Sequence, residues 1–501
     1  MAHIRTHRGR RQPQPPRTLG GGARLVMVTL FCVFFAAPLC RAQLADTPWP
    51  TFHHDSQRTG RSPYLGPETA ALKWRFRLAN FSQSSIAIGE DDTIYCGDDG
   101  GIVYAINPDG SEKWRVQTDS TFIRSSGPAI NVDGTIYVGA TIYPDRDRSG
   151  GVLYAFNPDG SEKWRVHTGE YGHIYGSPTI GEDGIVYFGS RDRYLYAVSP
   201  QGEVRWRFPA SYIAATPSIG HDGRIYAATY VGNPNLLHCV NAKGQEDWQD
   251  RTGSDTFVGC AIADDGVIYT QTYNELLAHN PDGILRWRIR NYNGFGAPCI
   301  GHDGTIYTIG RDGLMAVSPA GDILWTADPI AGGPSPIVDA EGTIYAGPWA
   351  YRSDGSFKWI FREGQHYYTR PAMGRDGTLY IIGDTWLYAI GPGRGKPGPL
   401  LALTGDCPGR IEASVTRATP DGRIALSLSA PEGCGGQTTI PSGPCAGTVL
   451  PIGGARLVCV LIADGEGTAR LAGNVPGGAC GGRCLVALDV TTCKPSNAVG
   501  F

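Results

Sequence analysis

Charge and long apolar runs are what this 501-residue sequence has least of. Charged residues make up 18% of the chain, the formal net charge is -3, and no long basic run follows residue 30. The sequence therefore carries no electrostatic footprint for nucleic acid or for an anionic membrane. Beyond residue 43 no apolar run reaches the length of a membrane-spanning helix, so we expect no integral membrane segment in the mature chain.

Signatures of catalysis and of metal binding are also missing. The chain has no Gly-x-Ser-x-Gly elbow, no His-Glu-x-x-His pair and no glycine-rich phosphate loop. The closest pair of C-terminal cysteines is Cys480-x-x-x-Cys484, and no histidine follows Cys407, so no zinc site is expected there. We therefore name no catalytic residue and no metal ligand. The absence of these motifs favours a non-catalytic protein over an enzyme.

The first 43 residues have the composition of a signal peptide. Six arginines between Arg5 and Arg24 precede an apolar run of 15 residues, from Leu25 to Leu39. This run is short for a membrane span, and the small residue Ala42 suits cleavage directly after it. We therefore predict an exported protein of the periplasm, the cell surface or the extracellular medium. An uncleaved N-terminal anchor is the alternative.

Cysteine is spread unevenly. Seven of the 13 cysteines lie between Cys407 and Cys493, which predicts disulfide bonds in an oxidising compartment. Because seven is an odd number, at least one of these thiols is free or pairs elsewhere. Segments such as Arg423 to Leu428 and Arg456 to Ile462 alternate in polarity. The region is therefore predicted to be a small disulfide-rich β-sandwich-like domain.

A repeat of about 40 residues dominates the middle of the sequence. A turn and strand related to Asp-Gly-x-Ile-Tyr, in which the first copy has Asp-Asp and the others have Asp-Gly or Glu-Gly, occurs eight times and ends at Tyr95, Tyr137, Tyr187, Tyr226, Tyr269, Tyr307, Tyr345 and Tyr380. A strand containing tryptophan also occurs eight times, at Trp74, Trp114, Trp164, Trp206, Trp248, Trp287, Trp325 and Trp359. Each repeat holds four short strands separated by turns rich in Pro, Asp and Gly. Four strands in about 40 residues are typical of one propeller blade.

The phase of the repeat predicts how the ring closes. The first Trp strand precedes any complete repeat, and the last repeat, from Thr369 to Ile390, has none after it. A single small sheet cannot bury both faces, whereas a closed ring of sheets can. We therefore predict an all-β, eight-bladed β-propeller of four-stranded blades, closed by the N-terminal strand. The repeated tryptophans are its structural residues, buried between blades.

Changes in composition place the domain boundaries. We predict a signal peptide at 1–43, a segment at 44–70 that we call the pre-propeller segment, and the propeller at 71–391. A linker rich in Gly and Pro at 392–400 then leads to the cysteine-rich β-module at 401–501.

The repeat resembles that of the pyrroloquinoline-quinone (PQQ) enzymes. The stretch from Ala105 to Trp114, and its near copy from Ala155 to Trp164, resemble the PQQ-type repeat in the Ala-led strand, acidic turn, Gly and Trp. The segment from Trp49 to Phe52 is similar to the start of many exported PQQ-like propellers. This resemblance covers roughly residues 47–391 and is specific for fold rather than for function.

The family of PQQ-like propellers contains two groups that differ in whether they bind a cofactor. Quinoprotein dehydrogenases hold PQQ and calcium on the propeller axis, whereas members such as outer-membrane assembly factor B are non-catalytic protein-binding scaffolds. This chain has no Cys-Cys pair and no long insertions over the blades, and we assign none of its residues to the calcium-binding Glu, Asn and Asp of the dehydrogenases. The resemblance therefore favours the non-catalytic members and no cofactor, with PQQ and calcium as the alternative.

One acidic segment begins like a calcium loop. It runs from Asp145 through Asp147 to Gly150, but its twelfth position is Phe156 instead of a carboxylate. A solvated charged hairpin is the preferred interpretation, and a calcium site is the alternative.

Bulky and cationic side chains recur in the loops that join each Trp strand to the next inner strand. The candidate ligand-binding residues are Phe81, Phe122, Arg124, His173, Tyr175, Tyr212, Phe257, Tyr292, Phe295, Tyr367 and Arg370. In a propeller such loops gather at one mouth of the central channel, where aromatic and cationic groups suit a peptide strand or a sugar. The alternative is that these side chains fill the channel or pack between blades.

These observations lead to one preferred function and two alternatives. We expect an exported, non-catalytic binding scaffold that uses the propeller face for a protein or carbohydrate ligand. A PQQ-dependent oxidoreductase and a carbohydrate-active propeller are the alternatives. The sequence leaves the oligomeric state open.

Overall fold

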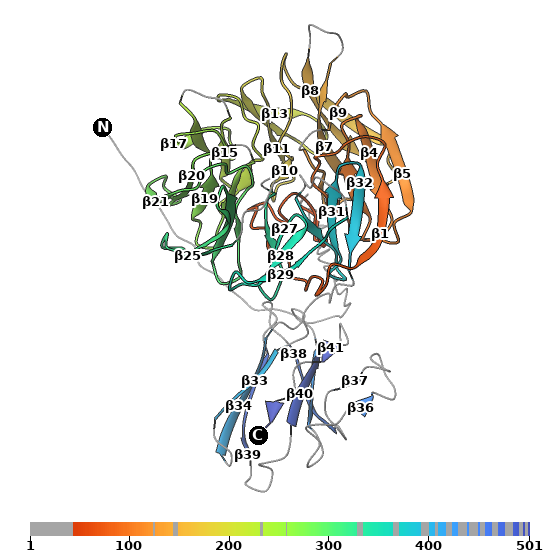
Figure 1. The fold of residues 1–501 in the computed structure, drawn as a ribbon, viewed down its shortest axis with the longest axis vertical. Helices are drawn as coiled ribbons and strands as arrows, with labels where there is room; N and C mark the ends of the chain where they lie inside the picture. The colour runs from red at the N-terminus through yellow and green to blue at the C-terminus, as the bar shows by residue number, and fades with distance from the viewer. Residues whose placement is uncertain are drawn as a thin grey trace, which may run out of the picture. The chain divides into compact units, whose positions relative to one another are not determined.

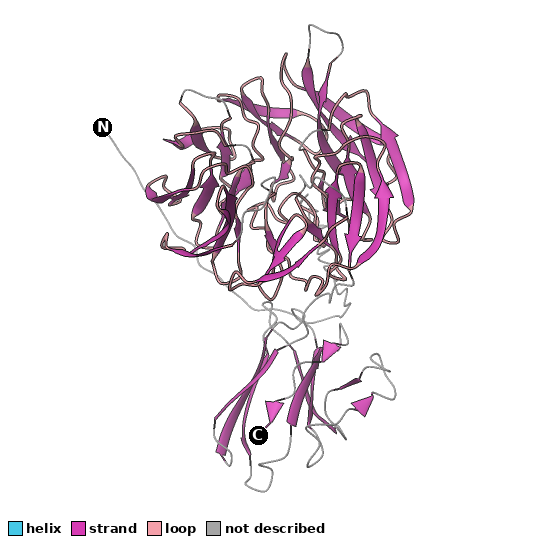
Figure 2. Cartoon of the chain, viewed as in Figure 1, coloured by secondary structure: helices cyan, strands magenta, loops and turns pink. Residues whose placement is uncertain are grey.

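The fold was taken from a computed structural model that describes most of the propeller. The described residues are 44–123, 126–143, 149–230, 234–256, 258–327, 334–363 and 370–391, and beyond residue 399 only the backbone of short strands. Every regular element among them is a β-strand (Figure 2), which confirms the predicted all-β class. This part of the chain therefore contains no helix that could cross a membrane. The signal peptide and most of the linker and of the calcium-like loop lie outside the described residues.

The repeat region forms eight four-stranded antiparallel sheets, so the predicted eight-bladed propeller is confirmed. Figure 1 shows the sheets arranged around a central axis. Seven blades each use four consecutive strands, from the innermost to the outermost. Blade 1 contains β2 (Ala87–Ile88), β3 (Ile94–Gly97), β4 (Ile102–Ile106) and β5 (Glu112–Gln117). Blade 2 contains β6 (Ala129–Ile130), β7 (Ile136–Ile142), β8 (Gly150–Phe156) and β9 (Glu162–His167). Blade 3 contains β10 (Thr179–Ile180), β11 (Val186–Gly189), β12 (Tyr194–Val198) and β13 (Val204–Pro209).

The next four blades repeat this order. Blade 4 contains β14 (Ser218–Ile219), β15 (Ile225–Ala228), β16 (Leu236–Val240) and β17 (Glu246–Arg251). Blade 5 contains β18 (Cys260–Ile262), β19 (Ile268–Gln271), β20 (Glu275–His279) and β21 (Leu285–Arg290). Blade 6 contains β22 (Cys299–Ile300), β23 (Ile306–Gly310), β24 (Gly313–Val317) and β25 (Ile323–Thr326). Blade 7 contains β26 (Ile337–Val338), β27 (Ile344–Ala346), β28 (Trp349–Tyr351) and β29 (Phe357–Ile360).

Blade 8 is assembled from both ends of the repeat region. Its first three strands are β30 (Ala372–Met373), β31 (Leu379–Gly383) and β32 (Trp386–Ile390), and its outermost strand is β1 (Leu72–Arg77). The pairing of β1 with β32 is antiparallel and places Arg75 opposite Tyr388. The N-terminal strand thus closes the ring, as the phase of the repeat predicts.

A repeated Ala–Trp pair explains the register of the outermost strand. In blade 1, Ala105 on β4 lies opposite Trp114 on β5, and a bulge follows between Ala105 and Ile106. The small alanine leaves room for the indole, which packs against Tyr95 of the same blade with ring centroids 5.8 Å apart. The Trp114 indole N–H donates to Pro158 O of the next blade at 2.9 Å. Seven of the eight repeat tryptophans thus join a Tyr of their own blade to a turn of the neighbouring blade.

The turn that receives the indole needs glycine. Gly160 has φ +86°, and a Cβ there would lie 2.8 Å from the Trp114 ring. Trp359 is an exception, because its indole donates to Pro67 O of the pre-propeller segment at 3.1 Å. Trp359 is 7% exposed, whereas the other seven repeat tryptophans are half-buried. Packing between blades therefore buries these rings only in part.

The C-terminal region forms its own β-sheets. One sheet orders β33 (Leu400–Gly405), β34 (Gly409–Thr416) and β39 (Ala469–Val475). A second orders β38 (Arg456–Ile462), β35 (Arg423–Leu428), β40 (Cys484–Asp489) and β41 (Lys494–Pro495), with β42 (Val499–Gly500) also on β40. The short strands β36 (Thr438–Thr439) and β37 (Val449–Leu450) pair with each other. The predicted disulfides of this region lie outside what the structure describes.

Candidate functional site

The pre-propeller segment lies on the innermost strands of the ring. The last residue of the innermost strand donates its backbone N–H to a carbonyl of this segment in six blades. The bonds are Ile88 to Trp49 (2.7 Å), Ile130 to Pro50 (2.9 Å), Ile219 to Ser56 (2.8 Å), Ile262 to Gln57 (2.9 Å), Ile300 to Thr59 (2.8 Å) and Val338 to Gly60 (2.9 Å). In a seventh blade, the Ser56 hydroxyl donates to Ile180 O at 2.9 Å. The segment thus pairs backbone groups that the central axis would otherwise leave open.

Unusual backbone angles let this segment follow the ring. His53, His54 and Arg58 have φ values of +56°, +74° and +61°, in the left-handed region that most residues avoid. Gly60, with φ +69°, passes so close to blade 6 that a Cβ would lie 2.7 Å from Cys299 Cβ. A run of strained residues persists only where the surrounding contacts fix it, so the segment is firmly built into the propeller.

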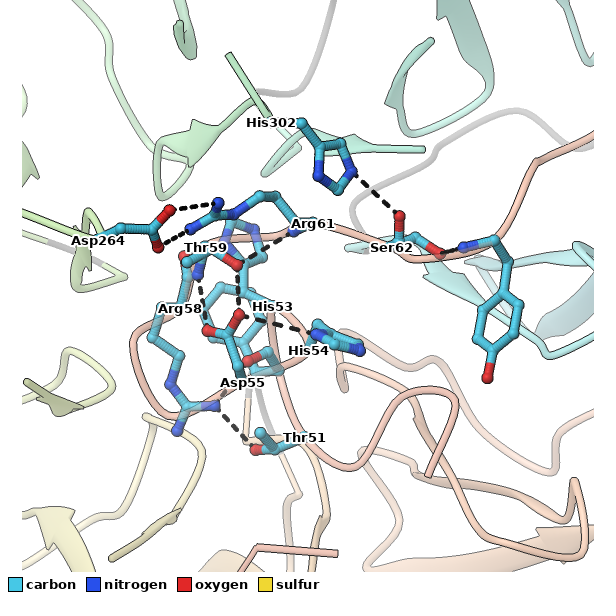
Figure 3. Close-up of polar contacts among 12 residues, drawn as sticks. Thr51, His53, His54, Asp55, Arg58, Thr59, Arg61, Ser62, Asp264 and His302 are labelled. Carbon is cyan, nitrogen blue, oxygen red and sulfur yellow. Dashed lines mark hydrogen bonds and ion pairs between the residues drawn. The ribbon is translucent and has the colours of Figure 1, made fainter. Parts of the chain in front are cut away.

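Arg58 is the anchor of the segment (Figure 3) and is fully buried. Its guanidinium donates to Phe52 O at 2.6 Å and to Thr51 Oγ1 at 2.9 Å within the segment. The same group reaches blades 3 and 4, where it donates to Pro178 O at 3.1 Å, Pro217 O at 3.4 Å and Thr179 Oγ1. Burial lowers the pKa of Arg58 to about 9, so it remains charged at neutral pH. One cation thereby joins the segment to two blades.

Phe52 and His53 complete the filling of the axis beside Arg58. The Phe52 ring packs against Val258 and Ala297 of blades 5 and 6 and is 1% exposed. The Arg370 guanidinium lies over the same ring, 5.1 Å from its centroid. Burial lowers the pKa of His53 to about 3, so the imidazole is neutral, and its Nδ1 lies 3.2 Å from Arg58 O. Side chains of the pre-propeller segment therefore occupy the axis.

Beside the segment, on the side of the repeated Asp-Gly turns, lies a cavity of about 250 Å³ that is lined mainly by polar residues. Its walls include His54 and Arg61 of the segment together with His221, Asp264 and His302 from turns of blades 4, 5 and 6. Arg61 and Asp264 form a two-bond ion pair at 2.6 and 3.0 Å (Figure 3). Among the described residues, no three His, Cys, Asp or Glu side chains stand close enough to hold a metal ion.

Aromatic and cationic side chains meet at the other end of the blades. The loops between blades and the hairpins between the second and third strands both lie at this end, which we call the loop face. A continuous set of contacts crosses blades 2 to 4 there. We call it the aromatic stripe, and it consists of Phe122, Tyr143, His173, Tyr175, Arg191, Arg193 and Tyr212.

Ring contacts make the first half of the stripe. The centroids of Phe122 and Tyr143 are 5.9 Å apart, those of Tyr143 and His173 are 5.4 Å apart, and those of His173 and Tyr175 are 5.7 Å apart. His173 also bonds on both sides, with Nδ1 3.0 Å from the Tyr175 hydroxyl and Nε2 2.8 Å from Ser149 Oγ. Burial and the nearby Arg191 lower the pKa of His173, so the ring is neutral at pH 7.

Two arginines complete the stripe. The Arg191 guanidinium lies 5.7 Å from the Tyr175 ring centroid and 5.4 Å from that of Tyr212, so it stands between two tyrosines. Arg193, with φ +75°, lies 5.5 Å from the Tyr212 centroid. Tyr143 is 45% exposed, and both tyrosines beside Arg191 are half-buried. The stripe thus offers rigid aromatic surface with two cations set into it.

The structure divides the residues predicted from the sequence into several groups. Phe122, His173, Tyr175 and Tyr212 come together in the stripe. Tyr292 and Phe295 are 46% and 44% exposed in the loop between blades 5 and 6, where Phe295 packs on Tyr273. Phe81 lies in the loop after β1, and its backbone carbonyl accepts a hydrogen bond from Asp99 N at 2.8 Å. Arg370 lies on the axis over Phe52, while Arg124, Phe257 and Tyr367 lie outside the described residues.

Three members of the stripe were missed by sequence reasoning. Tyr143, Arg191 and Arg193 come from the hairpins between the second and third strands of blades 2 and 3. The candidates predicted from the sequence all come from the loops between blades. Both kinds of loop end at the same face, so the Arg-Asp-Arg sequence of the second hairpin was the available signal.

Comparison with solved structures finds many similar chains. The crystal structure of BamB from Moraxella catarrhalis matches with a TM-score of 0.52 and 17% identity, covering 64% of this chain and 96% of that one. A protein of unknown function from Bacteroides caccae matches at 16% identity and a TM-score of 0.32, covering 42% and 89% of the two chains. The WD40 propeller domain of Doa1 matches at 11% identity and a TM-score of 0.44, covering 64% and 96%. A search of curated proteins finds no match.

A family profile gives the more specific result. The profile of the family described as "Outer membrane protein assembly factor BamB" matches residues 57–148 and 148–361, which together are more than half of the chain. The matched region spans blades 1 to 7 and the end of the pre-propeller segment. The chain therefore belongs to the BamB family of PQQ-like repeat propellers and is closer to BamB than to the quinoprotein dehydrogenases.

Proposed function

We propose that this chain is an exported, non-catalytic scaffold that binds another protein through the aromatic stripe. The observation that carries the proposal is the Tyr175–Arg191–Tyr212 stack, which is partly exposed and lies on the loop face. Tyr and Arg are the residues most enriched at the energetic centres of protein interfaces. Membership of the BamB family supports both the scaffold role and a location in the periplasm or at the outer membrane.

The charges of the aromatic stripe indicate which chemical class of partner segment it can bind. Arg191 and Arg193 present two guanidinium groups in one short hairpin, and the neutral His173 adds no charge. Asp192 between them is turned inward, where it accepts bonds from the Tyr196 hydroxyl at 2.5 Å and from Gly169 N at 2.8 Å. A partner segment that combines carboxylates with apolar side chains complements this surface.

Substituting the stack tests the proposal. We expect Tyr212→Ala and Arg191→Ala to reduce the recovery of a bound partner at least about tenfold, because each removes a central contact of about 2 kcal/mol or more. Phe357→Ala is the matched control, since Phe357 is 53% exposed but lies on the outermost strand of blade 7. The measurement is cross-linking of the tagged chain in its native envelope, followed by quantitative mass spectrometry. Equal recovery for all three variants would contradict the proposal, and glycan binding lost only in Tyr212→Ala would reassign the stripe to a sugar.

We further propose that the propeller holds neither PQQ nor calcium on its axis. The support is that Phe52, His53 and Arg58 lie buried on that axis and pack against or hydrogen-bond to the surrounding blades. Titrating the purified chain with PQQ and calcium chloride should leave the quinone absorbance unchanged. A stoichiometric spectral shift, or dye reduction by an alcohol in the presence of both additives, would show a quinoprotein oxidoreductase instead.

A further inference from the structure

Each blade ends in an outermost strand with an open edge. These eight strands are the last members of their sheets, and each pairs with the third strand of its blade on one side only. An open edge is a template for pairing with another chain, and proteins commonly blunt it with charged side chains. Seven of the eight strands follow this rule, because each contains at least one Lys or Arg. The cations include Lys73, Lys113, Lys163, Arg205, Arg251, Arg286 and Lys358.

The outermost strand of blade 6 breaks the rule. It is β25, Ile323–Thr326, with the sequence Ile-Leu-Trp-Thr and no charged residue. Leu324 occupies the position directly before the repeated Trp, where six of the other seven strands carry Lys or Arg and one carries Asp247. Ile323 and Leu324 are 52% and 54% exposed. This edge therefore lacks the charge that protects the others.

Several of the cations on the other outermost strands form ion pairs. Lys113 pairs with Asp91 at 2.7 Å and Lys163 with Asp133 at 3.1 Å, each joining the outermost strand to the Asp-Gly turn of its own blade. Lys358 pairs with Glu68 at 3.0 Å. A strand added beside any of these edges would have to bury or displace a paired charge, which is unfavourable. Among the described outermost strands, only β25 contains no charged side chain that a neighbouring strand would bury or displace.

We propose that β25 pairs with the β25 strand of a second copy of this chain, in antiparallel fashion about a two-fold axis. The charge pattern selects this occupant, because every other outermost strand on a second propeller would bring a Lys or Arg against Ile323 and Leu324. When the β25 strands of two copies pair with each other, neither open edge is left for a third copy. The assembly therefore closes as a dimer and does not grow into a fibre. The backbone supplies the bonds, and the exposed Ile and Leu supply apolar contact across the pair.

Sedimentation velocity of the full exported chain from about 1 to 100 μM tests this proposal, since a four-residue pairing gives a weak interface. We expect a concentration-dependent dimer. Leu324→Lys, which restores the residue type of the other blades, should weaken dimerisation at least about tenfold because two lysines enter each dimer. The matched control is Val204→Lys, which adds the same charge at a 44% exposed position of the outermost strand of blade 3. That variant should dimerise like the unmodified chain.

Amide hydrogen exchange identifies the strand that pairs. The outward amides of β25 should exchange more slowly as protein concentration rises, while those of β21 in blade 5, which carries Arg286, Arg288 and Arg290, should not change. A chain that stays monomeric over the whole range would overturn the proposal. A dimer that Leu324→Lys leaves intact, or one without protection of β25, would overturn it equally.

Discussion

Replacing Arg58 with methionine removes the cation at the centre of the propeller while keeping much of the side-chain volume. The guanidinium makes five hydrogen bonds, three of them to backbone carbonyls. Bonds from a charged donor contribute about 1.5 kcal/mol or more each, so their loss costs about 7 kcal/mol. Burial of the cation opposes this, because a pKa lowered from 12.5 to about 9 corresponds to about 5 kcal/mol. We therefore expect the free energy of unfolding to fall by about 2–3 kcal/mol.

Urea unfolding, followed by tryptophan fluorescence, measures this difference. The control is Arg61→Met in the same segment, where the ion pair with the 74% exposed Asp264 carboxylate should contribute less than about 1 kcal/mol. If Arg58→Met is no more destabilising than Arg61→Met, Arg58 is not the anchor of the segment and the reasoning fails.

Two further predictions concern a turn and a buried imidazole. Gly283→Ala should lower the free energy of unfolding by about 1–2 kcal/mol more than Gly223→Ala, because a Cβ at Gly283 meets the Trp248 ring at 2.7 Å whereas one at Gly223 meets nothing within 4 Å. Both positions have positive φ, so the difference measured by urea titration isolates the clash, and equal losses would argue against the Trp contact. His53 has its pKa lowered from 6.5 to about 3, so the unfolded chain binds its proton more readily than the folded one. The contribution of His53 to the free energy of unfolding is therefore complete above about pH 6.5. It falls by about 2–3 kcal/mol as the pH is lowered from 6.5 to 4.5. His53→Asn, which tolerates φ +56°, should show a shallower dependence of unfolding midpoint on pH, and an unchanged slope would contradict the assignment.

The repeated residues made the fold predictable. A Trp that needs a small residue opposite it recurs with every blade, and seven of the eight also have a glycine turn beside them, so Trp74 to Trp359 count the blades directly. The unmatched first Trp strand showed that β1 must complete blade 8. Both inferences depend on local strand pairing that recurs in each repeat.

The filling of the axis could not be predicted in the same way. Residues such as Phe52 and Arg58 occur once, and their partners are backbone groups of several blades, which leave no side-chain signature in the sequence. Arg370 was placed among the loop-face candidates because it follows an interblade loop. The structure instead sets it over Phe52, a contact that depends on the segment lying on the axis. Tyr175 and Tyr212 were predicted from their loops, but the Arg191 that joins them comes from a hairpin that was not considered.

Amide hydrogen exchange at the innermost strands tests the central claim most directly. If the pre-propeller segment fills the axis, the N–H groups of Ile88, Ile130, Ile219, Ile262, Ile300 and Val338 should be as protected as those of the second strands, because each donates to a carbonyl of the segment. These six amides report the segment alone, since no sheet neighbour lies on the axial side of the innermost strand. Exchange of these amides at the rate of open loops, in a chain whose second strands stay protected, would contradict the account.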